Sequence, residues 1–289
     1  MAPDSAMNPR FAKAALIALQ FLAVTVADAQ EPTTLLRSDQ RPLAVSVYAP
    51  GGGNCQGFAL ISPGAGGSER GYAYLARGMA SRGYLTLVMG HPDSGRSALR
   101  EHVRGTGLRD GLADLITEPE AYRSRFMDMA AARQWARARC AGTDSILIGH
   151  SMGAATVMME AGARNKLGLQ GSDAFNAYVA LSPQGAGLIF PEGAWSCLRK
   201  PLLMLTGTRD TELGGASWET RTEAFRNMPA GCKWLGVIEG ASHMNFAGTR
   251  LSSRMEDLTL QTLGAFLEGR RHGDCRLPDK LQGLELRAR

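Results

Sequence analysis

The pentapeptide Gly149-His150-Ser151-Met152-Gly153 holds the side chain best placed in this sequence for nucleophilic chemistry. It follows the apolar run 146–148 and precedes the helix-forming stretch 154–159, so the chain is expected to turn sharply from strand to helix at Ser151. Glycine fits on both sides because side chains two residues from the serine would crowd so tight a turn. The Ser151 hydroxyl would then stand free at a helix N-terminus, where unpaired N–H groups favour developing negative charge.

A serine nucleophile needs a histidine base, and that histidine needs a carboxylate to orient it. After a turn of this kind, the acid and then the histidine follow along the chain, each on a loop after a strand. Asp210 comes after the apolar run 202–206, and His243 comes after 234–238. Both are therefore expected at the carboxyl ends of strands, on the sheet edge that carries Ser151.

Other residues compete for these two roles. Glu239 stands at a strand end nearer to His243 and is the alternative acid, whereas Asp210 could also serve as a turn-forming residue. Among the histidines, His91 and His102 precede the serine, His150 is expected to point away inside the turn, and His272 lies near the C-terminus. Position and order therefore favour Asp210 and His243.

Backbone N–H groups are expected to stabilise the oxyanion that forms when Ser151 attacks a carbonyl carbon. One is the N–H of Met152, directly after the nucleophile, and the other is the N–H of Ala65 in the glycine-rich loop 62–67. That loop could be mistaken for a dinucleotide cradle. Glu69 occupies the position of the third glycine in that motif and no P-loop lysine follows, so phosphate binding is disfavoured.

Short apolar runs alternate with longer helical patterns along the chain. The runs are continuous rather than alternating, as in strands buried on both faces, and they cover 43–48, 58–62, 85–89, 146–149, 178–181, 202–206 and 234–238. Helices are expected over 69–81, 118–139, 152–164, 218–227 and 253–268. This alternation predicts an α/β fold, a mostly parallel sheet with helices on both faces.

The length of 289 residues, with 44% hydrophobic and 20% charged residues, is typical of one ordinary globular domain. The net charge of +5 is mild and no dense basic run precedes the C-terminal stretch, so no nucleic-acid partner is expected. We place one folded domain at 30–271 and a loosely held tail at 272–289. The glycine-rich stretch 90–116 either covers the site or is a surface excursion, and it shapes the pocket together with 162–174. The oligomeric state stays open.

The N-terminal stretch 1–29 has the layout of a secretory signal peptide. Arg10 and Lys13 precede the apolar stretch 14–27, and an A-x-A site predicts cleavage near Ala29. The apolar stretch is short for a membrane span, so no stable membrane insertion is expected, although an uncleaved anchor or a buried helix are alternatives. The prediction is a periplasmic or secreted protein, whose translation starts at Met1 or Met7.

Taken together, five motifs resemble the α/β-hydrolase superfamily, and within it the bacterial predicted dienelactone hydrolases related to platelet-activating-factor acetylhydrolase. The likeness covers roughly 40–270 and rests on S-P-G-x-G-G (62–67), G-H-S-M-G-A (149–154), S-P-Q-G (182–185), L-T-G-T-R-D (205–210) and G-A-S-H-M-N-F (240–246). It implies an eight-stranded, mostly parallel sheet and ester hydrolysis through an acyl-serine. Dienelactone hydrolases carry cysteine where Ser151 stands. Polyester hydrolases of the cutinase type are similar too. They usually carry an aromatic residue where Ala65 stands and a tryptophan near the position of Gln184, and this chain has neither.

The resemblance also suggests how the cysteines pair in an oxidising compartment. In that superfamily the strands that lead to Ser62 and Gly149 lie side by side, and Cys55 and Cys140 precede them at the same end. Cys197 and Cys232 likewise precede the strands that lead to Asp210 and His243. We therefore predict the disulfides Cys55–Cys140 and Cys197–Cys232 with Cys275 unpaired; buried free thiols are the alternative. No metal site is expected, because histidines are scarce and neither H-E-x-x-H nor C-x-x-C occurs.

The sequence thus predicts a serine esterase that acts on a small-molecule ester through Ser151, His243 and Asp210 and needs no cofactor. A thioesterase, a lactonase, a peptidase or a polyester hydrolase of the cutinase type could use the same three residues, since they are indifferent to the leaving group. A binding protein that kept the fold and lost the activity is the alternative from another class.

Overall fold

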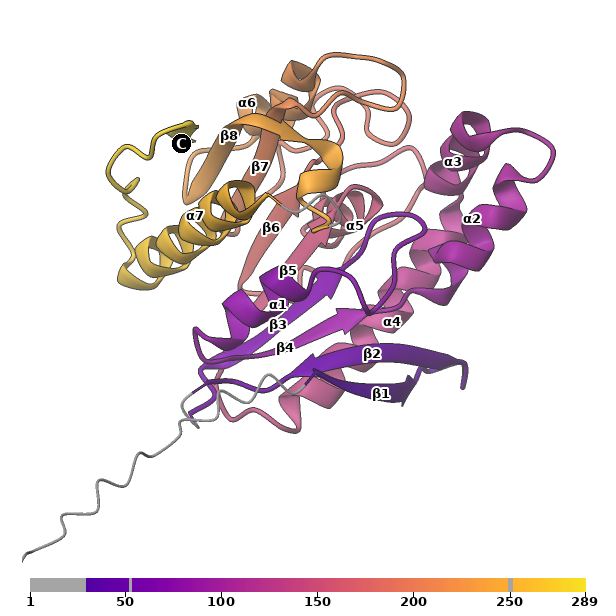
Figure 1. The fold of residues 1–289 in the computed structure, drawn as a ribbon, viewed down its shortest axis with the longest axis horizontal. Helices are drawn as coiled ribbons and strands as arrows, with labels where there is room; N and C mark the ends of the chain where they lie inside the picture. The colour runs from indigo at the N-terminus through magenta and orange to yellow at the C-terminus, as the bar shows by residue number, and fades with distance from the viewer. Residues whose placement is uncertain (1–29, 52–53, 249–251) are drawn as a thin grey trace, which may run out of the picture.

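One mixed β-sheet runs through the computed structural model, which describes residues 30–51, 54–248 and 252–289 (Figure 1). The strand order is β1-β2-β4-β3-β5-β6-β7-β8-β9, and the strands from β4 to β8 are parallel to one another. The strands are β1 Gln30–Leu36, β2 Pro42–Tyr48, β3 Gly57–Ser62, β4 Tyr84–Met89, β5 Asp144–His150, β6 Ala177–Leu181, β7 Leu202–Arg209, β8 Lys233–Ser242 and β9 Leu284–Ala288.

Helices cover both faces of this sheet (Figure 1). They are α1 Ala73–Ala80, α2 Arg96–Val103, α3 Leu108–Thr117, α4 Pro119–Arg137, α5 Met152–Glu160, α6 Glu223–Asn227 and α7 Ser253–His272, with short 3-10 helices at Pro92–Ser94, Trp218–Thr222 and His243–Asn245. Strand residues alternate between two buried clusters. Leu60 and Leu147 pack with α4 and α5, whereas Ile61 and Ile148 pack with α1 and α7. The continuous apolar runs therefore fill two cores, one on each face.

Among the described residues the sheet has nine strands, not the eight implied by the family resemblance. The edge strand β9 pairs antiparallel with β8, so 272–289 is not a loosely held tail throughout. Leu284 is the one buried residue of β9, which is why a search for continuous apolar runs misses this strand. At the other edge, β1 pairs antiparallel with β2.

The stretch 90–116 holds two helices that the sequence did not predict. Helices α2 and α3 form a hairpin that stands beside α4 at the carboxyl ends of the strands (Figure 1). Helix α2 has only eight residues and none of them is fully buried, so its apolar side chains form only a short, half-buried stripe. The predicted signal peptide 1–29 lies outside the described residues. Within the described ranges, no helix is both long enough and apolar enough to cross a bilayer.

The disulfide prediction is right for one pair and wrong for the other. Cys55 and Cys140 are bonded at the amino ends of β3 and β5, as predicted. Cys232 is bonded to Cys275 rather than to Cys197, which is exposed and has its thiol next to the Gly162 carbonyl. The physical reason is that α7 packs on the sheet and ends just before Cys275, so the chain after this helix returns to the start of β8, next to Cys232. The Trp234 indole N–H then donates to the Cys275 carbonyl at 3.0 Å.

We therefore expect denatured, unreduced protein to show one free thiol per chain, and Cys197→Ser to remove it without loss of stability. Cys275→Ser should lower the free energy of unfolding by about 2–5 kcal/mol, since it opens a cross-link between distant parts of the chain. Thiol titration and urea unfolding measure the two effects. Equal losses of stability in the two variants would contradict this assignment.

Candidate active site

Ser151 occupies a strained turn between β5 and α5. Its backbone has φ 55° and ψ −118°, a conformation that non-glycine residues rarely adopt. The neighbouring glycines are needed for space: a Cβ on Gly149 would lie 2.1 Å from the Gly153 carbonyl oxygen, and one on Gly153 would lie 1.9 Å from the Ser62 carbonyl oxygen. The serine is therefore held at the tip of the strand, with its side chain on the wall of a cavity.

His243 and Asp210 meet at the carboxyl ends of β8 and β7. The His243 Nδ1 atom lies 2.9 Å from Asp210 Oδ1, and the Asp210 side chain is fully buried. The other carboxylate oxygen of Asp210 accepts hydrogen bonds from the hydroxyls of Ser182 and Thr206. These contacts hold the Asp210 carboxylate in one orientation. Its hydrogen bond with Nδ1 then fixes the orientation of the His243 ring.

The charge of Asp210 is maintained despite its burial. Burial alone would raise the pKa of this carboxyl, but the hydrogen bond with His243 and the nearby Arg221 guanidinium outweigh it and hold the pKa below its usual range. Arg221 is itself buried and donates to the backbone carbonyls of Asp210, Ser182 and Pro183. It thereby joins the loops after β6 and β7, a role that no sequence motif had indicated.

Ser151 and His243 share a cavity of about 270 Å³. Its polar wall also includes Gln184 and Arg221, and its apolar wall is formed by Leu112, Ile116, Leu188, Ile189 and Leu213. Leu112 and Ile116 come from α3, so the stretch 90–116 does cover the site, whereas no residue of 162–174 lines this cavity. In the described part of the chain, no hydrogen bond joins the Ser151 hydroxyl to the His243 ring.

The loop 62–67 lies directly against Ser151. A Cβ on Gly64 would come within 3.2 Å of the Ser151 Cβ, so the backbone of this loop contacts the serine closely. Met152 is the first residue of α5, and its N–H therefore has no partner within the helix. Neither this N–H nor that of Ala65 finds an acceptor among the described residues. Both N–H groups belong to segments that adjoin Ser151.

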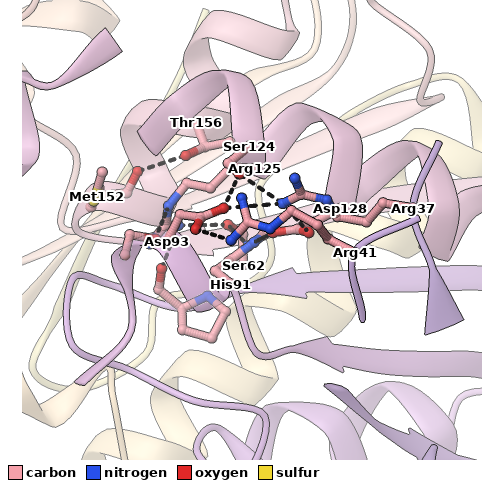
Figure 2. Close-up of polar contacts among 12 residues, drawn as sticks. Arg37, Arg41, Ser62, His91, Asp93, Ser124, Arg125, Asp128, Met152 and Thr156 are labelled. Atoms are coloured by element: carbon pink, nitrogen blue, oxygen red, sulfur yellow. Dashed lines mark hydrogen bonds and ion pairs between the residues drawn. The ribbon is translucent and has the colours of Figure 1, made fainter. Parts of the chain in front are cut away.

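A buried polar cluster supports the loop 62–67 from the side of α4 (Figure 2). The Arg125 guanidinium donates to the Ser62 hydroxyl at 3.1 Å, to the Pro63 carbonyl at 2.8 Å and to the Ser94 hydroxyl at 2.8 Å. In turn, the Ser94 carbonyl accepts the N–H of Gly66 at 2.8 Å. One buried arginine therefore fixes both ends of this loop.

His91 continues the same cluster (Figure 2). Its Nε2 atom lies 2.9 Å from the Ser62 hydroxyl, and its Nδ1 atom lies 2.8 Å from Asp128, which also faces Arg37. Burial, and next the charge of Arg125, lower the pKa of His91 to about 4, so the ring is neutral near pH 7. Nδ1 then donates to Asp128, and Nε2 accepts the proton of the Ser62 hydroxyl, whose fully buried oxygen is unsuited to attack a substrate.

The structure places Ser151 and His243 on the wall of one cavity and the buried Asp210 carboxylate against His243, with the loop of Ala65 and the start of α5 next to Ser151. The rival acid Glu239 is exposed and donates its backbone N–H to Gly283, away from the His243 ring. His102, on α2, faces Glu118, and His272 is the last residue of α7. No group of histidines, cysteines and carboxylates within the described ranges could hold a metal ion.

The buried neutral His91 should make the fold sensitive to acid. Its pKa is about 4 when folded and about 6.5 when unfolded, so below pH 6.5 the unfolded chain binds a proton that the folded chain does not. The contribution of neutral His91 to the free energy of unfolding is fully present above pH 6.5, and about 3 kcal/mol of it is lost as the pH falls to 4.

Urea unfolding at pH 7, 5.5 and 4 measures this loss. The variant His91→Gln has no titrating group at this position and should show a smaller fall in its free energy of unfolding over the same range. Parallel pH profiles for the two proteins would contradict the assignment.

Comparisons with known proteins support the fold. The chain matches no protein-family model and no curated protein. Solved structures do match it: an esterase domain from a Rhodothermus marinus protein has 17% identity and a TM-score of 0.55, covering 84% of this chain and 98% of that one. An esterase from Pyrococcus furiosus has 16% identity and a TM-score of 0.57, covering 83% and 92%. An α/β serine hydrolase without a lid from Xanthomonas campestris has 18% identity and a TM-score of 0.52, covering 86% and 97%. The chain therefore has the α/β-hydrolase fold.

Proposed function

We propose that this chain is a serine hydrolase that cleaves carboxylic esters through an acyl-serine at Ser151. The observation that carries the proposal is the hydrogen bond of 2.9 Å between buried Asp210 and His243, at the cavity that Ser151 lines. A histidine oriented by a buried carboxylate beside a serine is the arrangement that activates a hydroxyl for acyl transfer. Esterases among the structures of the same fold are consistent with this chemistry.

In the proposed reaction, the Ser151 oxygen attacks the ester carbonyl carbon while His243 Nε2 takes the hydroxyl proton. Asp210 holds the Nδ1–H tautomer and stabilises the imidazolium that forms. The N–H groups of Ala65 and Met152 bind the oxyanion of the tetrahedral intermediate. His243 returns the proton to the departing alcohol, and a water molecule then releases the acid by the same steps. The hydrogen bond from Ser151 to His243 often tightens only in the substrate complex of such enzymes.

The cavity and the cysteines extend the proposal. Five apolar side chains line the cavity, and the guanidinium of Arg221 on its wall is occupied by backbone carbonyls and by the Asp210 carboxylate. We therefore expect an uncharged ester with an apolar acyl group. Two disulfides favour an oxidising compartment, hence a periplasmic or secreted enzyme. The sequence motifs favour the dienelactone hydrolase and platelet-activating-factor acetylhydrolase branch of the superfamily.

Substitution of the three residues tests the mechanism. Ser151→Ala should abolish hydrolysis of p-nitrophenyl acetate and labelling by a fluorophosphonate, without loss of folding. Asp210→Asn should lower kcat by about 10⁴-fold, because the histidine loses the partner that fixes its tautomer. Glu239→Gln is the matched control and should keep wild-type activity. Activity in Ser151→Ala, or a loss confined to Glu239→Gln, would refute the assignment.

The cavity should set the preferred acyl chain. Ile116→Trp adds volume on the cavity wall and should shift the preference toward shorter chains in a series of p-nitrophenyl esters from acetate to dodecanoate. Leu108→Trp, on the exposed side of the same helix, should leave the series unchanged, because Leu108 is 66% exposed and lies outside the cavity. An unchanged series in Ile116→Trp would show that the acyl group does not occupy this cavity.

A further inference from the structure

A chain of three hydrogen bonds passes behind the nucleophile and is not used by the reaction steps above. The Gly64 N–H donates to the Tyr72 hydroxyl at 3.0 Å. The Tyr72 hydroxyl lies 2.9 Å from His150 Nδ1, and His150 Nε2 lies 3.0 Å from the backbone carbonyl of His243. The chain thus begins on the loop that carries Ala65, one of the two proposed oxyanion donors, and ends on the backbone of the proposed catalytic base.

The two ends determine the direction of every bond in this chain. The His243 carbonyl can only accept, so His150 Nε2 carries the proton and Nδ1 is left as an acceptor. Tyr72 then donates its hydroxyl proton to Nδ1 and accepts from Gly64. Burial, followed by the neighbouring His243, holds the pKa of His150 well below 6.5, and burial raises the pKa of Tyr72 to about 12. Both side chains therefore keep these protonation states throughout the working pH range of an esterase.

The sheet itself does not fix the two ends relative to each other. The loop 62–67 follows β3 and His243 follows β8, and the strands β5, β6 and β7 lie between them in the sheet. His150 is the last residue of β5 and is 3% exposed, and its ring centroid is 4.7 Å from that of His243. Tyr72 is 5% exposed and has φ 59°, a left-handed conformation at the start of α1. Two buried side chains thus span the distance between the loops.

We propose that Tyr72 and His150 are positioning residues that hold the oxyanion loop and His243 at a fixed separation across Ser151. The inference rests on the proposed function, and it assigns to His150 a task beyond its place in the turn. Placement errors of about 1 Å at reacting groups can cost 10²-fold in rate. Loss of this link should therefore weaken binding of the transition state more than binding of the substrate.

Tyr72→Phe tests the link with the least disturbance, because it removes one oxygen and keeps the buried ring. The Gly64 N–H then has no acceptor and His150 Nδ1 has no donor. We expect kcat for p-nitrophenyl acetate to fall about 10- to 100-fold per active site, with KM changed less than about threefold. Titration with a fluorophosphonate counts the folded, active sites, so a loss of folded protein does not imitate the effect.

An inhibitor that resembles the intermediate adds a second readout. Ser151 adds to the carbonyl carbon of an alkyl trifluoromethyl ketone, its proton passes to His243, and the resulting hemiketal oxyanion faces Ala65 and Met152. The inhibition constant of this ketone should rise by the same factor as kcat/KM falls in Tyr72→Phe. A merely structural role for Tyr72 would leave the inhibition constant per active site unchanged.

Two substitutions at His150 separate the ends of the link. His150→Gln can place an N–H near the position of Nε2 and should retain more activity than His150→Leu, which has no polar group. The double variant Tyr72→Phe/His150→Leu should be no slower than His150→Leu alone, because both changes break the same chain. Fully additive losses in kcat would show that the two residues act separately, against the proposal.

Tyr84→Phe is the matched control, since Tyr84 is a buried tyrosine whose hydroxyl donates to Asp144 at the amino end of β5. It should keep the wild-type kcat per titrated site. A kcat in Tyr72→Phe equal to that of Tyr84→Phe would overturn the positioning role while leaving the esterase assignment intact, because Ser151→Ala would still be inactive. Activity in Ser151→Ala would instead overturn the proposed function and this inference with it.

Discussion

The close contact between two backbone segments determines the rest of this site. The ends of β3 and β5 are level in the sheet, with Ser62 paired to Gly149, so the loop that follows β3 is pressed against the turn that follows β5. A side chain on Gly153 would overlap the Ser62 carbonyl oxygen. The loop 62–67 can therefore reach Ser151 only because the residue at position 153 is glycine. The loop that carries Ala65 and the start of α5 at Met152 therefore lie next to Ser151.

Buried arginines hold the loops that surround this contact. Loops at the carboxyl edge of a sheet have carbonyl groups that no neighbouring strand can satisfy, and a guanidinium offers several donors in a rigid plane. Arg125 binds the Pro63 carbonyl beside the nucleophile, and Arg221 binds carbonyls in the loops after β6 and β7. Each charge is costly to bury, which restricts the loops to the arrangement that satisfies it. The site is therefore rigid where it follows the strands.

The sequence predicted the centre of the sheet, and it led to the hypothesis of Ser151, Asp210 and His243 as one site, because both follow local rules. A strand that is buried on both faces reads as an apolar run, and a nucleophile turn needs glycines at fixed spacing. The edge strands do not follow such a rule: β9 buries only Leu284. The partner of Cys232 depends on how α7 packs across the sheet, and the helices α2 and α3 lie in a glycine-rich, charged stretch. Contacts of this kind are set by tertiary packing, which one sequence does not reveal.

His150 shows how a correct local inference can miss a role. Side chains alternate along a strand, so His150 faces the same side as Ile148, toward α1, and away from the cavity of Ser151. The sequence therefore predicted that it points away, which it does. What the sequence could not indicate is that the buried Tyr72, directly before α1, lies at this point and that the His243 carbonyl accepts a hydrogen bond from His150 Nε2. The residue before Ser151 thereby connects the opposite face of the sheet to the loops of the site, so Tyr72, directly before α1, contributes to the geometry of a pocket that it does not line.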